Sequence, residues 1–121
     1  MHLKTALPSV LAALLLAAPL LIQTAPAENA PRRIEITAKR FNFTPGEITL
    51  KEGEPVVLVL KGMDVSHGLR IKELGVDLKV AKGKTSELNI TPDKTGTFVG
   101  HCSVFCGSGH GGMMLTLHVV D

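Results

Sequence analysis

Four side chains that bind soft metal ions are concentrated near the C-terminus of the chain. Cys102, Cys106, His110 and Met113 follow one another in the pattern C-x3-C-x3-H-x2-M. Thiolate, imidazole and thioether groups are ligands that copper favours in proteins. Glycines surround His110, and glycine permits the close backbone approach that a ligand-bearing loop needs. The segment 102–113 therefore predicts a copper site on a tight loop.

A second imidazole for this site is available from His67. This residue lies between the apolar run 56–60 and the alternating apolar and polar residues 69–72. Such a position corresponds to a loop at one end of a β-sandwich, where segments distant in the sequence meet. Blue-copper sites use two imidazoles, and His67 is the predicted partner of His110.

The second cysteine favours a binuclear centre over a mononuclear one. A mononuclear blue-copper site uses one thiolate, whereas two thiolates can bridge two copper ions and offset much of their positive charge. His67 and His110 would each bind one copper ion. Met113 suits one weak axial position, and the backbone carbonyl of Val104 suits the other.

Two alternatives remain open for these residues. Two cysteines separated by three residues in an exported protein also allow a disulfide. A bridge that closes so small a loop contributes little chain entropy, which favours a shared metal over a structural bridge. A slip of one residue would place Met114 rather than Met113 in the site.

Other candidate residues near the motif are better explained without metal binding. His101 precedes Cys102 on a strand and should point to the opposite face, as a surface or supporting residue. Asp64 is expected to hydrogen-bond its own loop, in preference to orienting an imidazole. Met114 is expected to pack in the core, and Met63 could line the rim of the site.

Short strands separated by turns account for the rest of the chain after residue 33. Apolar and polar residues alternate with a period of two in segments such as 34–39, 69–72 and 76–80. Turn residues recur about every ten residues, for example at 44–46 and 92–96. This pattern predicts an all-β domain, an antiparallel sandwich or barrel.

The N-terminal segment has the pattern of a secretory signal peptide. Residues 6–22 are almost unbroken apolar sequence, and Thr24 to Ala27 supply the small residues of a cleavage site. We expect residues 1–27 to be the signal, 28–32 a flexible tail and 33–121 the domain. The alternative is an uncleaved membrane anchor, although the run is short for a membrane span. Either reading places the domain in the periplasm or on the extracytoplasmic face of the membrane.

Charge and composition exclude some classes of function. The chain has 13 basic and 11 acidic residues and no run of Lys or Arg, which gives no footprint for nucleic acid. There is no nucleophile beside a general base, and the predicted ligands leave no open coordination position. We therefore expect no enzyme activity from the chain by itself.

These motifs resemble the binuclear copper A domain of cytochrome c oxidase subunit II, and that of nitrous oxide reductase. The resemblance rests on segment 64–68, which reads Asp-Val-Ser-His-Gly, and on segment 102–113. It implies a Greek-key cupredoxin sandwich of seven to eight strands that carries one electron at a time. It also implies Cys102 and Cys106 as bridging thiolates and His67 and His110 as terminal ligands, with the weak ligands Met113 and the Val104 carbonyl.

The chain departs from the oxidase domain in three ways. Oxidase subunit II usually has Glu at the position of Val104, where its side chain also serves a magnesium site. The oxidase domain follows a two-helix membrane hairpin, and its electrons enter through a surface Trp. This chain has no Trp and no Tyr. These departures favour a free-standing, exported domain, which we expect to be a monomer.

Electron transfer to or from a redox partner, such as a c-type cytochrome or an oxidase, is the function that these features favour. Alternatives are a periplasmic carrier that delivers copper to an oxidase, a metal-free redox dithiol, and a subunit of a terminal oxidase complex. A copper carrier should bind one Cu(I) and release it, whereas an electron carrier should hold copper through repeated redox cycles.

Overall fold

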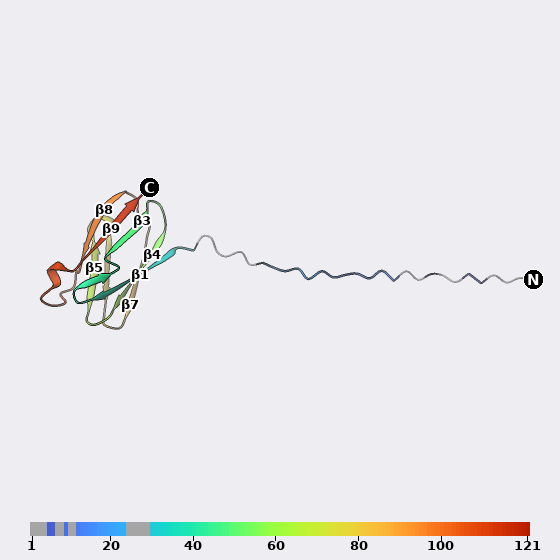
Figure 1. Ribbon diagram of the computed structural model, residues 1–121, viewed down its shortest axis with the longest axis horizontal. Helices are drawn as coiled ribbons and strands as arrows, with labels where there is room; N and C mark the ends of the chain where they lie inside the picture. Colours follow the sequence, from blue (N-terminus) through green and yellow to red (C-terminus); the bar gives the residue numbers. More distant parts are fainter. Residues whose placement is uncertain (1–4, 7–8, 10–11, 24–29) are drawn as a thin grey trace, which may run out of the picture.

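The computed structural model describes residues 5–6, 9, 12–23 and 30–121. Residues 12–23 form no helix or strand (Figure 1). Within the described residues, no helix has the length and apolar character needed to cross a membrane. The predicted cleavage site at residues 24–27 lies outside the described residues, so the predicted signal peptide stays a prediction.

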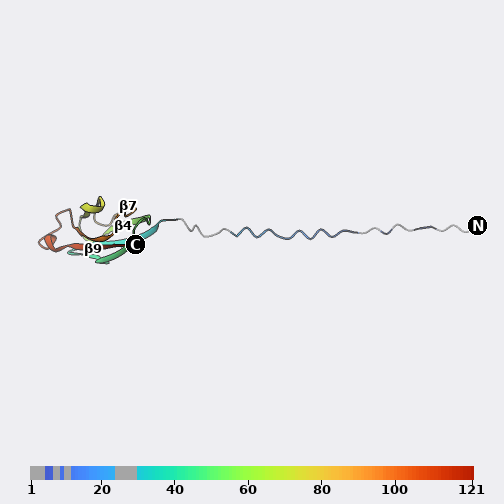
Figure 2. The same cartoon turned by 90° about the horizontal axis from the view of Figure 1, so that it is seen from above.

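Nine strands and two short 3-10 helices make up the described domain (Figures 1 and 2). The strands form two sheets, a four-stranded sheet in the order β2-β1-β4-β7 and a five-stranded sheet in the order β3-β9-β8-β5-β6. The elements are β1 (Arg32–Lys39), β2 (Asn42–Thr44), β3 (Glu47–Lys51), β4 (Val56–Gly62), β5 (His67–Ile71), η1 (Lys72–Leu74), β6 (Val76–Val80), β7 (Thr85–Ile90), β8 (Gly96–His101), η2 (His110–Gly112) and β9 (Met114–Val120).

The predicted all-β sandwich is confirmed, with two differences in detail. There are nine strands rather than seven to eight, and the three-residue β2 is the shortest of them. Not every pairing is antiparallel, because β1 pairs with β4 and β3 pairs with β9 in parallel. A period of two reports which face of a strand is buried, but it does not report the direction of the neighbouring strand.

Alternation along the strands builds the core between the sheets. In β9 the buried residues are Leu115, Leu117 and Val119, each separated by a more exposed residue. In β4 the whole run 56–60 is buried, as its unbroken apolar sequence predicts. Burial of these apolar side chains is the main force that holds the two sheets together.

The order of the five-stranded sheet decides where the predicted ligands meet. β8 runs antiparallel to both of its neighbours, β5 and β9. The C-terminal end of β8 therefore lies beside the N-terminal end of β9, where His101 pairs with Met114. The chain that follows β8 runs toward the N-terminal end of β5, since the Ser103 amide donates to the Gly68 carbonyl. His67 is the first residue of β5, Cys102 directly follows β8, and Met113 directly precedes β9. Two segments distant in the sequence, the start of β5 and the loop 102–113, thus bring their donor atoms to one end of the domain.

Candidate metal centre

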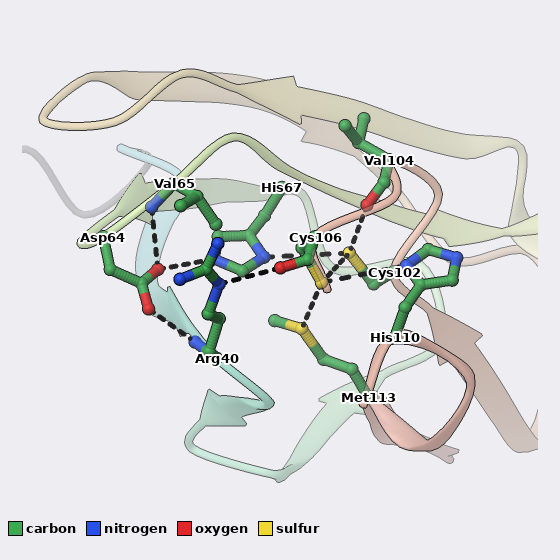
Figure 3. A network of polar contacts seen from close by, with 9 residues as sticks. All are labelled: Arg40, Asp64, Val65, His67, Cys102, Val104, Cys106, His110 and Met113. Atoms are coloured by element: carbon green, nitrogen blue, oxygen red, sulfur yellow. Dashed lines mark hydrogen bonds and ion pairs between the residues drawn. The ribbon is translucent and has the colours of Figure 1, made fainter. Parts of the chain in front are cut away.

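The two cysteine sulfurs form the middle of a buried cluster (Figure 3). The Sγ atoms of Cys102 and Cys106 lie 3.7 Å apart, and both thiols are free and buried. His67 Nδ1 lies 3.8 Å from Cys102 Sγ, and His110 Nδ1 lies 3.7 Å from Cys106 Sγ. Each imidazole therefore faces a different sulfur of the pair.

The two weaker donors are also divided between the two cysteine sulfurs. The Cys102 thiol donates to the carbonyl oxygen of Val104 at 3.2 Å, whereas Met113 Sδ lies 3.8 Å from Cys106 Sγ. Met113 is fully buried, whereas Met114 is 48% exposed and starts β9. All six residues that sequence analysis selected lie in one cluster, and the expected core packing of Met114 is wrong. Met113 carries the only methionine sulfur in hydrogen-bond range of a thiol in the described part of the chain.

The donor set of the cluster fits copper. His67, Cys102 and Cys106 each offer a ligand atom, and these three atoms all lie within 4.8 Å of one another. Two soft sulfurs, imidazole nitrogens and a thioether are the donors that select copper over harder ions such as magnesium or calcium. Cys102, Cys106 and Met113 belong to the hydrophobic core cluster, and the apolar side chains around them limit their contact with water.

Burial raises the pKa of the Cys106 thiol to about 11, and hydrogen bonding and charge from Cys102 add to the shift. In the metal-free protein, Cys106 is therefore a neutral thiol at neutral pH. Because a metal binds the thiolate, it must displace this proton, so metal binding releases protons from the site.

Asp64 holds the imidazole of His67 in place. Its Oδ1 atom accepts hydrogen bonds from the Val65 amide at 2.9 Å and from His67 Nε2 at 2.8 Å. The hydrogen bond from His67 lowers the pKa of Asp64 to about 2, so the carboxylate is ionised and can only accept. The Nε2 proton is thereby fixed, and Nδ1 is left free to face the sulfurs. Asp64 bonds its own loop as expected, but it also orients the imidazole.

Replacing Asp64 with alanine should weaken copper binding by about 10–100-fold, the usual effect of removing a residue that orients a metal ligand. The imidazole would lose its acceptor, and two backbone amides would lose theirs. Competition with a Cu(I) chelator measures the affinity. The control is Asp77→Ala, which removes the same charge from an exposed position in β6. Equal affinities for the two variants would contradict this role of Asp64.

Arg40 is a residue of the site that sequence analysis missed. Its side-chain Nε donates to the carbonyl oxygen of Cys106 at 2.8 Å, and its backbone amide donates to Asp64 Oδ2 at 2.9 Å. It therefore ties the end of β1 to both ligand-bearing loops (Figure 3). No pattern in the sequence points to it, because 66 residues separate Arg40 from Cys106.

The His110 loop packs tightly against the ring of Phe41. A Cβ atom added to Gly109 would lie 2.5 Å from two atoms of this ring, well inside van der Waals contact. Phe41 is itself partly buried against the core. The loop can therefore approach the first sheet only because residue 109 has no side chain.

We expect Gly109→Ala to destabilise the domain by about 1–3 kcal/mol, the usual cost of overpacking, and to weaken copper binding because His110 moves with the loop. Gly111→Ala is the matched control, since a Cβ at Gly111 meets nothing within 4 Å. Urea unfolding of the metal-free proteins and chelator competition measure both effects. Equal behaviour of the two variants would show that the Phe41 contact does not position the loop.

The remaining candidates lie on the surface around the cluster. His101 is exposed, as expected, and Met63 is 56% exposed. Phe105 is 78% exposed, yet its ring centroid lies 5.5 Å from that of His110. An apolar side chain thus stands beside one of the two imidazoles at the protein surface.

Comparison with known proteins agrees with this fold. The model of the cupredoxin-like domain family matches residues 11–115. The chain belongs to the cupredoxin-like family. The cupredoxin family implied by the resemblance of the two sequence motifs is thereby confirmed.

Two relatives of this cupredoxin are cytochrome c oxidase subunit 2 proteins of Thermus thermophilus. Each is 26% identical over 100 residues, which are 83% of this chain. The matched region spans 72% of one relative and 58% of the other. The cupredoxin thus covers only part of these proteins.

Solved structures share the fold at low sequence identity. The periplasmic domain of cytochrome oxidase subunit II (CoxB) of Bradyrhizobium japonicum has a TM-score of 0.68 and 22% identity, covering 74% of this chain and 84% of that domain. Auracyanin A, a blue copper protein of Chloroflexus aurantiacus, has a TM-score of 0.62 and 20% identity, covering 75% of this chain and all of that one. The same fold therefore occurs both in an oxidase subunit domain and in a blue copper protein.

Proposed function

We propose that this cupredoxin is an electron-transfer protein with a binuclear copper centre of the copper A type. The observation that carries the proposal is the pair of buried thiols 3.7 Å apart, each with its own imidazole. A mononuclear site would need only one of these sulfurs. In the proposed centre both sulfurs would hold the two copper ions together, and each half of the site would offer one nitrogen and one weak donor.

The proposed ligands are the six residues of the cluster. Cys102 and Cys106 would bridge, His67 and His110 would bind through Nδ1, and the weak donors would be Met113 Sδ and the Val104 carbonyl. Bound copper supplies the atoms that gain and lose one electron. The donor atoms already lie 3.2–3.8 Å from a neighbouring donor, so the arrangement is formed before metal binding.

The role of the chain in electron transfer is to hold the donors still. The Cys102 amide donates to the Met113 carbonyl at 3.1 Å, which joins the two ends of the ligand loop. Arg40 and Asp64 connect that loop to the His67 loop. Because the ligands are fixed by hydrogen bonds and by the core, they need to move little when the charge of the site changes. Little movement means a small reorganisation cost for each electron transferred.

The subunit 2 relatives support this proposal and suggest its setting. A domain like theirs would work outside the cytoplasm, in keeping with a signal at residues 1–27, a tail at 28–32 and a cupredoxin domain at 33–121. Its partner would be another redox protein, such as a c-type cytochrome or an oxidase. The Phe105 ring beside His110 offers an exposed apolar contact at which such a partner could approach the centre.

Copper stoichiometry combined with EPR tests the proposal. The reduced protein is loaded with copper under anaerobic conditions, oxidised by one electron and measured. Two copper ions for each chain, with the unpaired electron shared over both nuclei, are expected. One copper with a localised signal would indicate a mononuclear centre instead. A single Cu(I) that leaves readily to an acceptor would indicate a copper carrier.

A further inference from the structure

A cavity of about 400 Å³ opens at the surface beside the proposed centre. Both Cys102 and His110 line this cavity, although Cys102 is only 4% exposed. It therefore lets a small complex in solvent approach two residues of the cluster, Cys102 and His110. Four further residues that matter for its chemistry also line it: Arg70, Lys72, Glu73 and His101.

His101 brings an additional copper donor to the cavity. It is the last residue of β8, and its direct cross-strand partner is Met114, the first residue of β9. Opposed residues of an antiparallel pair project to the same face, with Cβ atoms about 5 Å apart. Both side chains are exposed. An imidazole and a thioether, which suit Cu(I), thus lie together on the outer face, next to the cavity and outside the centre.

The rim of the cavity carries more positive than negative charge. Arg70 lies opposite His101 in the sheet, and Lys72 comes two residues after Arg70. Glu73 is the one carboxylate among the residues that line the cavity. Neither Arg70 nor Lys72 forms an ion pair with any residue in the described part of the chain. A cationic rim suits a copper ion that arrives inside a negatively charged complex, and it disfavours a bare cuprous ion.

We propose that this cavity is the pocket through which the centre is loaded, and that His101 is the first protein ligand for Cu(I) delivered by an anionic complex. The inference rests on the proposed function, since it assumes that the cluster binds copper. Arg70 and Lys72 hold the anionic carrier at the rim. His101, with Met114 beside it, replaces one donor of the carrier.

Transfer to the centre is then a ligand exchange inside the cavity. Cys102 and His110 replace His101 and the remaining donor of the carrier, and the Cys102 proton passes to solvent as the sulfur–copper bond forms. The carrier leaves with all its donor atoms. Copper stays in the +1 state throughout, so no oxidant or reductant takes part.

The test follows the rate at which the reduced, metal-free protein removes Cu(I) from its anionic bicinchoninate complex, monitored by the loss of colour under anaerobic conditions. The His101→Ala variant should load roughly tenfold more slowly, on the scale of losing a residue that supports a metal site. It should reach the same final copper content. His118→Ala is the matched control, because His118 is a partly exposed imidazole of β9 that does not line the cavity.

Equal loading rates for His101→Ala and His118→Ala would overturn the proposal. Arg70→Gln should slow loading about twofold at low ionic strength, the effect of one exposed charge, and added salt should remove the difference. An unchanged rate for Arg70→Gln would overturn the assignment of an anionic carrier. A final content of one copper ion would refute the binuclear centre, yet the loading rates could still be compared, so the two failures are distinguishable.

Discussion

Cys106→Ser should abolish the proposed binuclear copper centre and leave at most one bound copper ion. Cys106 contacts three other donors of the cluster, since its Sγ lies 3.7 Å from Cys102 Sγ, 3.7 Å from His110 Nδ1 and 3.8 Å from Met113 Sδ. A serine oxygen is a hard and weakly acidic donor that does not replace a bridging thiolate. The variant should therefore lose one of the two sulfurs that we propose as bridges between the copper ions.

Copper analysis and EPR of the loaded variant measure this effect. The unpaired electron, if a signal remains, should be localised on one nucleus. Val104→Ala is the control, because it shortens a side chain between the two cysteines and keeps the carbonyl that faces Cys102. It should retain two copper ions. A Cys106→Ser protein that still holds two ions with a shared electron would refute the bridging role.

Leu117→Ala should destabilise the domain by about 2–5 kcal/mol, a large part of the roughly 5–15 kcal/mol that holds a typical domain together. Leu117 is fully buried in β9, directly between Ile48 of β3 and Phe98 of β8. Truncation leaves a cavity at the strand that follows the ligand loop. Because β8 and β9 together position the loop, loss of their packing should also weaken the site.

Urea unfolding of the metal-free protein measures the change in stability. Val120→Ala is the control in the same strand, since Val120 is 44% exposed, and it should alter the free energy of unfolding by less than about 0.5 kcal/mol. Bound copper should raise the midpoint of both variants, because a ligand that binds only the folded state stabilises it. Similar losses in the two metal-free variants would show that β9 is not part of a well-packed core.

Much of the fold follows from local sequence, with limits that have a physical origin. Alternation in segments such as 76–80 correctly predicts a half-buried strand, β6, because side chains on successive residues face opposite sides. The parallel pairing of β1 with β4 was not predictable in this way. The direction of a strand depends on the path of the connections that cross from one sheet to the other. Alternation of apolar and polar residues carries no information about that path.

The candidate site, too, was predictable from the sequence only in part. Segment 102–113 places two cysteine sulfurs and an imidazole within one loop, so the type of donor is evident from the sequence alone. Asp64 was expected to serve its own loop, and its further bond to His67 Nε2 depends on the turn before β5. The exposure of Met114 was also missed. Met114 begins β9 and lies on the outer face beside His101, whereas its neighbour Met113 points inward.

By itself, the sequence determined the donor types, their spacing on one loop and the all-β class of the domain, because these depend on residues close together in the chain. Tertiary structure alone decided that His67 meets Cys102, that Arg40 reaches the Cys106 carbonyl, and that His101 shares a cavity with His110. Those contacts arise from the antiparallel placement of β8 between β5 and β9 and from the packing of one sheet on the other. They join residues far apart in the chain, whose proximity is set by burial of the shared core.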